Sequence, residues 1–148
     1  MLTVGKTLVV AAVVLTAACD PAPPEEPEEK AAVHTDPAPV AEEFPEVGEI
    51  VEASWVEERV GVSEGRIEAP GPTDLRLSAV VQLRLEAVSK VMSGKECHAG
   101  APAVPESLEA LLPTGVAWLS CELPATGKAR TAFVAAGSER AFLTYTTM

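Results

Sequence analysis

The C-terminal third of the chain reads GVAWLSCEL at residues 115–123, ARTAFVAA at 129–136 and RAFLTYTT at 140–147. These segments are rich in β-branched and aromatic residues, which favour extended structure. Pro124 and a Thr-Gly-Lys sequence at 126–128 separate the first two segments, and Gly137-Ser138 separates the last two. Short segments of this kind, bounded by Gly and Pro, predict a three-stranded antiparallel meander.

The segment from 73 to 93 has the spacing of an amphipathic helix. Its apolar residues recur at intervals of three and four: Leu77, Val81, Leu85, Val88 and Met92. Such a stripe is typical of a helix that packs on a core. The polar residues at 73 and 74 can cap its start, and Gly94 can end it. Residues 75–77 and 83–85 also alternate as a strand would, but the length and the caps favour a helix.

Two further segments complete the expected fold. Residues 106–112 can form one or two helical turns before Pro113. Residues 49–68 fit a strand or hairpin with Ser63-Glu64-Gly65 as the turn, although a helix ending at Gly61 is also compatible with the pattern. Together the patterns predict a small α+β domain over residues 47–148, with one amphipathic helix packed on an antiparallel sheet that ends in the meander.

The chain has 148 residues and a formal charge of -11, and this charge is unevenly distributed. Residues 20–46 contain seven prolines, nine acids and one base. Such a segment has too few apolar side chains to offset the entropy lost on ordering. We therefore expect residues 19–46 to form a disordered tether in which His34 is solvated and not a metal ligand. The acidic balance argues against nucleic acid as a partner, because phosphate binding requires clustered Lys and Arg.

The first 18 residues carry one charge, Lys6, and an apolar run at 8–15. This run is too short for a transmembrane helix, which needs about 20 residues, and it predicts a signal peptide over residues 1–18. The sequence Leu-Thr-Ala-Ala-Cys at 15–19 resembles the lipobox of bacterial lipoproteins. The resemblance covers residues 1–19 alone. It implies cleavage before Cys19 by signal peptidase II, and attachment of diacylglycerol and a further acyl chain such as palmitate to that cysteine. An ordinary signal peptide cleaved elsewhere is the alternative.

The same resemblance implies a location. A lipoprotein of this type is held in the bacterial cell envelope by its acyl chains and faces the periplasm. Asp20 follows the lipidated cysteine directly. An aspartate there resembles the signal that retains lipoproteins in the inner membrane, so we expect the inner membrane rather than the outer one.

Lipidation of Cys19 leaves an even pair of cysteines, Cys97 and Cys121. Outside the cytoplasm such a pair is typically oxidised, so we expect a disulfide between them. It would join the segment after the expected helix to the first strand of the meander. This matters for a small domain in which aromatic residues are only 4% of the chain.

No motif indicates a catalytic residue, a metal site or a cofactor. Cys97 is followed by His98, but adjacent residues project in different directions and a nucleophile and its base normally meet across a fold. The sequence contains no CxxC, HxxxH, HExxH or SxxK pattern. The Gly-Lys pairs at 94–95 and 127–128 lack the remaining residues of a phosphate loop.

The sequence therefore predicts a non-enzymatic lipoprotein of the cell envelope. Its domain would act as a binding or accessory module on a flexible stalk, with an envelope protein as partner. An inhibitor or immunity lipoprotein is one form of such a module. A small periplasmic hydrolase or ligand carrier is the alternative from another class, and a pocket with convergent carboxylates would favour it.

Overall fold

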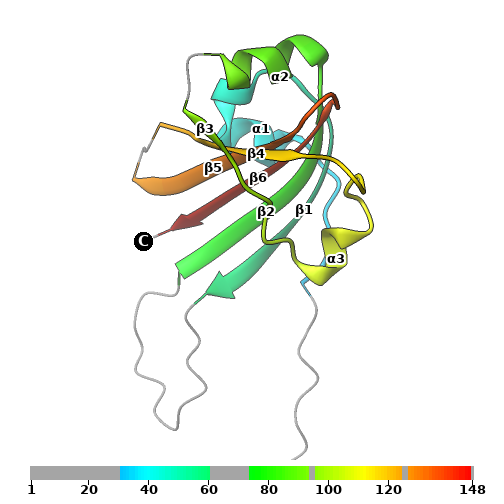
Figure 1. The fold of residues 1–148 in the computed structure, drawn as a ribbon. Coiled ribbons are helices and arrows are strands. Elements are labelled where there is room, and N and C mark those ends of the chain that lie inside the picture. The colour runs from blue at the N-terminus through cyan, green and yellow to red at the C-terminus, as the bar shows by residue number, and fades with distance from the viewer. Residues whose placement is uncertain (1–30, 61–73, 94–95, 125–126, 148) are drawn as a thin grey trace, which may run out of the picture.

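A computed structural model describes residues 31–60, 74–93, 96–124 and 127–147. Its strands form one antiparallel sheet in the order β1-β2-β6-β5-β4-β3 (Figure 1). The strands are β1 (Ile50–Val60), β2 (Asp74–Leu83), β3 (Cys97–Ala99), β4 (Trp118–Glu122), β5 (Lys128–Ala135) and β6 (Arg140–Thr147). The helices are α1 (Ala38–Glu43), the 3-10 helix η1 (Pro45–Val47), α2 (Leu85–Met92) and α3 (Glu106–Glu109). The expected α+β class is confirmed.

The sheet has apolar side chains packed on both of its faces. On one face α1, η1 and α2 pack against side chains of β1, β2, β5 and β6, and the fully buried residues there include Val40, Phe44 and Val91. On the other face Leu108 of α3 packs with Val56, Val80 and Phe142. Figure 1 shows α1 and α3 on opposite sides of the sheet. The core therefore consists of two apolar clusters with the sheet between them.

The meander is present as expected. Strands β4 and β5 pair antiparallel, and so do β5 and β6. Gly137 lies in the turn between β5 and β6 with φ 72°, in the left-handed region that favours glycine. Of the helical turns expected at 106–112, the structure has the helix α3 at Glu106–Glu109, directly after Pro105.

The helix predicted over residues 73–93 is wrong for its first half. Residues 74–83 form strand β2, and the helix α2 covers 85–92 alone. β2 lies between β1 and β6 and is covered on both faces, so residues 77–81 are buried consecutively and the alternation typical of a strand is lost. The apolar stripe is split in the same way: Leu77, Val81 and Val88 are buried, while Leu85 is 61% exposed and Met92 is 39% exposed.

The tether predicted over residues 19–46 extends too far into the domain. Residues 31–46 are folded onto the sheet, and the side chains of Val40 and Phe44 are fully buried. A short extended segment first pairs with β1 through His34, and α1 and η1 follow. Few but large apolar side chains, assisted by ion pairs to β5, are enough to order a segment that its Pro and Glu content marks as disordered. The folded domain therefore begins before Val47.

Residues 50–60 form a strand, as preferred over a helix, and this strand pairs antiparallel with β2. The turn expected at Ser63-Glu64-Gly65 lies outside the described residues. So do the expected signal peptide, Cys19 and Asp20. No helix in the described part of the chain is long and apolar enough to span a membrane.

Candidate functional site

The predicted disulfide joins Cys97 to Cys121. The two residues face each other in the β3–β4 pair, with their Cα atoms 4.2 Å apart. The Cys121 side chain is fully buried in the larger apolar cluster, and Cys97 packs against that cluster. His98 faces Ser120, so by the alternation of a strand its side chain lies on the opposite face of the sheet from the disulfide. Cys97 and His98 therefore do not form a thiol–imidazole pair.

A group of four charged side chains links the N-terminal segment to β5. We call it the ionic seam: Glu43 and Glu46 from the N-terminal segment, and Lys128 and Arg130 from β5. Lys128 and Arg130 lie on the face of β5 that also carries the buried Ala132 and Val134. Charged side chains on the buried face of a strand require partners, and the acids of α1 and η1 provide them.

Arg130 is the most buried member of the seam, with 6% of its surface exposed. Its Nη1 donates to the backbone carbonyl of Glu43 at 2.7 Å, and its Nη2 donates to that of Pro124 at 2.7 Å. Both nitrogens also donate to the carboxylate of Glu46. Among the described residues no acceptor reaches Arg130 Nε. The guanidinium therefore joins η1, the end of α1 and the end of β4 in one contact.

Lys128 forms the second half of the seam. Its Nζ lies 2.8 Å and 2.7 Å from the two carboxylate oxygens of Glu43, and 4.4 Å from the centre of the Tyr145 ring. The hydrogen bond to Glu43 raises the pKa of Lys128. Burial, followed by the nearby Glu43 carboxylate, raises the pKa of Tyr145. Both groups therefore keep their protons near neutral pH, so neither is prepared to act as a nucleophile or base.

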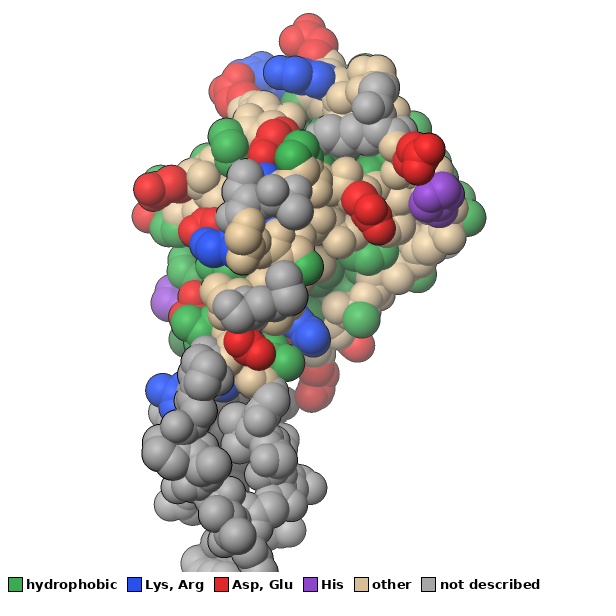
Figure 2. Space-filling view, turned by 90° about the vertical axis from the view of Figure 1, so that its left-hand side faces the viewer, with side chains coloured by type: hydrophobic (Ala, Val, Ile, Leu, Met, Phe, Trp, Pro, Cys, Tyr) green, Lys and Arg blue, Asp and Glu red, His purple; other side chains and the backbone are tan. Residues whose placement is uncertain are grey.

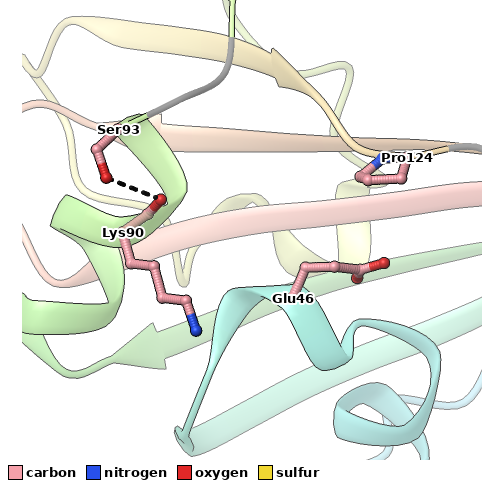
Figure 3. A pocket seen from close by; sticks show the side chains of 4 residues that line it. All are labelled: Glu46, Lys90, Ser93 and Pro124. Atoms are coloured by element: carbon pink, nitrogen blue, oxygen red, sulfur yellow. Dashed lines mark hydrogen bonds between the residues drawn. The ribbon is translucent and has the colours of Figure 1, made fainter.

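An open pocket of about 370 Å³ lies beside the seam. Its lining residues are Lys90 of α2, Ser93 directly after α2, Glu46 of η1 and Pro124 after β4 (Figure 3). Figure 3 shows the Glu46 side chain directed away from Lys90, in agreement with its ion pair to Arg130, and Ser93 Oγ donating to the Lys90 carbonyl. The volume is at the lower end of the range for small-molecule sites. The charged groups of the pocket are therefore the Lys90 ammonium and the Glu46 carboxylate, and the latter is already paired with Arg130.

A separate ion pair joins Arg84, before α2, to Glu49, before β1. The Arg84 Nε lies 2.6 Å from Glu49 Oε2 and Nη2 lies 3.1 Å from Oε1. This hydrogen bonding lowers the pKa of Glu49, and it raises that of Arg84. Both side chains are more than half exposed, so solvent screens the pair and it contributes little to stability.

Sequence reasoning missed the ionic seam and found the disulfide. The signal for the seam was the alternation of side chains along the strand. It places Lys128 and Arg130 on the same, buried face as Ala132 and Val134. Within the described ranges no cluster of three or more His, Cys, Asp or Glu residues could hold a metal ion. No protein-family model matches the chain, and the comparisons with curated proteins and with solved structures found no match either.

Proposed function

We propose that the protein is a lipid-anchored lipoprotein of the bacterial cell envelope whose acidic domain binds a positively charged protein partner. The observation that carries the proposal is the charge of the folded residues. The described part of the chain contains 15 acidic and seven basic residues, of which 11 acids and all seven bases lie at 47–147. Because the domain includes residues 31–46, its net charge is more negative than that of a domain that starts at Val47.

Three of the seven bases are committed to ion pairs with acids: Arg84 with Glu49, Lys128 with Glu43 and Arg130 with Glu46. This leaves twelve acids against four bases among the described residues outside these pairs. Figure 2 shows acidic side chains spread over the face that it draws, with Lys and Arg side chains fewer. A surface of this kind attracts positively charged proteins over a distance and raises their association rate.

Two further features support an exported, anchored protein. A disulfide such as Cys97–Cys121 persists in oxidising compartments, which include the periplasm. The lipobox-like sequence that ends at Cys19 would supply an anchor of several acyl chains, which binds a bilayer firmly. In this proposal the segment between Cys19 and Ala31 is the stalk, and the domain that begins at Ala31 searches for its partner within reach of the membrane.

The test is affinity capture with the full chain from detergent-solubilised envelopes at low and at high salt. We expect one stoichiometric protein partner at low salt and at least tenfold less of it at high salt. A matched variant carries Lys in place of Glu42, Glu52 and Glu109, which are all exposed. It should lose the partner at low salt while keeping the melting temperature within a few degrees. Capture that is insensitive to both changes, or turnover in a substrate screen without a partner, would contradict the proposal.

A further inference from the structure

Among the described residues, the chain itself pairs with one edge of the sheet, at β1, and leaves the other edge, at β3, open. At the β1 edge the chain's own N-terminal segment adds a short strand-like contact, in which His34 N–H donates to Trp55 O at 2.8 Å and Trp55 N–H donates to His34 O at 2.9 Å. The His34 ring also stacks on the Trp55 ring, with centroids 4.4 Å apart. The other edge is formed by β3. No described residue forms a hydrogen bond to the outer side of β3.

The register shows which backbone groups of β3 face outward. Gly100 N–H donates to Trp118 O of β4, so the backbone groups of Gly100 and of His98, two residues earlier, point toward β4. Alternation along the strand then directs the N–H and C=O groups of Cys97 and Ala99 away from the sheet. The Cα separation of 4.2 Å between Cys97 and Cys121 fits such a pair, because facing residues without mutual hydrogen bonds lie closest together.

The disulfide holds this edge in place. β3 has three residues, and its ladder to β4 has three facing pairs. A strand so short has few hydrogen bonds of its own, but the covalent link of Cys97 to the buried Cys121 fixes it against the sheet. Small and exposed side chains end and follow it: Ala99 is its last residue, and Ala101 and Ala103 come after it. The outward groups are therefore pre-organised.

The charges beside the edge indicate what it would accept. Glu96, directly before β3, and Glu122, the last residue of β4, flank the Cys97–Cys121 pair, and both are exposed. A cation from a partner strand would relieve the repulsion between these carboxylates. We propose that the outer edge of β3 receives an extended, positively charged segment of the partner protein by strand addition. The inference rests on the proposed function and assigns the place and manner of binding.

The test uses the full chain in detergent micelles and a ten-residue peptide of alternating Thr and Lys. Its twin has Glu in place of each Lys. We expect the lysine peptide to slow hydrogen exchange of the Cys97 and Ala99 amides at least tenfold, as measured by NMR, and the glutamate peptide to leave both rates unchanged. Ala99→Pro removes an outward N–H without removing a hydrogen bond to β4, so it should weaken binding at least tenfold. Ala99→Val keeps the N–H and is the matched control, with binding within twofold of the original.

A second variant decides the matter if Ala99→Pro proves unfolded by circular dichroism. Glu96→Lys with Glu122→Lys should exchange the preference, so that the glutamate peptide binds and the lysine peptide does not. Unchanged amide exchange at Cys97 and Ala99, or an unchanged peptide preference in the double variant, would overturn the inference. The proposed function is tested separately by salt-dependent capture of the partner. If Ala99→Pro still captures that partner in full, the edge assignment fails and the proposed function stands.

Discussion

Arg130 on β5 binds the carboxylate of Glu46 on η1, 84 residues earlier in the sequence, through both terminal nitrogens of its guanidinium. The Arg130 side chain is 3% exposed and that of Glu46 is 25% exposed. The same guanidinium holds the carbonyl groups of Glu43 and Pro124. The pair thus joins the first described segment of the chain to the central part of the sheet.

Glu46→Gln should destabilise the domain by about 2–3 kcal/mol, because it leaves a buried guanidinium without its charged partner. This is less than the about 3–5 kcal/mol expected for a fully buried pair, because Glu46 keeps some contact with solvent. Glu49→Gln, which breaks the exposed pair with Arg84, is the matched control and should leave the free energy of unfolding nearly unchanged, because solvent screens that pair. Urea unfolding of the two variants measures the difference, and equal costs would refute the structural role of the seam.

The position where the domain starts is testable by truncation. A chain that starts at Ala31 should unfold at the same urea concentration as the mature protein. A chain that starts at Val47 lacks the buried Val40 and Phe44 and both acids of the ionic seam, so it should not fold. Phe44→Ala in the full chain should cost about 3–5 kcal/mol, as other buried aromatic truncations do. Cooperative unfolding of the chain that starts at Val47 would show that residues 31–46 are dispensable.

The disulfide should contribute about 3 kcal/mol, since it closes a loop of 24 residues. Reduction by dithiothreitol and the variant Cys97→Ser with Cys121→Ala should lower the urea midpoint by similar amounts. The urea midpoint of that double variant should not change with dithiothreitol. This controls for effects of the reductant other than reduction of the disulfide. A variant as stable as the oxidised protein would exclude a stabilising role.

Tyr145 is the single tyrosine in the chain, so absorbance near 295 nm follows its ionisation alone. Burial raises its pKa in the folded state. A raised pKa means that the folded state binds the proton more tightly, so the associated stability is full below about pH 10 and is lost as pH rises above it. We expect the native protein to titrate at higher pH than the urea-unfolded protein. Tyr145→Phe should reduce the fall in stability between pH 9 and pH 11, and an identical fall would contradict the assignment.

The lipid anchor is tested at Cys19. The mature protein should partition with membranes and show an intact mass increased by diacylglycerol and an acyl chain. Cys19→Ser should lose this mass and appear in the soluble fraction with its domain folded. A wild-type protein that partitions as soluble would show that the lipobox-like sequence is not used.

The meander could be predicted because its information is local. Alternating side chains between Gly and Pro define each strand, and β6 has the predicted bounds, Arg140–Thr147. β2 could not be distinguished from a helix, because its burial on both faces depends on β1 and β6, which lie elsewhere in the sequence. A strand covered on both faces has no alternation to recognise.

The N-terminal part of the domain was missed for a related reason. Phe44 and Val40 are isolated apolar residues among Pro and Glu, and only the sheet that they cover shows that they belong to a core. The disulfide could be predicted without such context, because setting Cys19 aside leaves an even pair of cysteines. The seam between Arg130 and Glu46 depends on a contact across 84 residues that no local pattern reports.

The route by which the chain enters the domain also determines how the molecule responds to a mechanical load. A pull transmitted from before Ala31 reaches the fold beside β1, where it acts first on the two hydrogen bonds between His34 and Trp55. The next resistance is the buried ring of Phe44 and the ion pairs of Glu43 and Glu46. Because the domain depends on the contacts of residues 31–46, a load that parts them should unfold the sheet as well, so the attachment of this segment sets the force that the domain withstands.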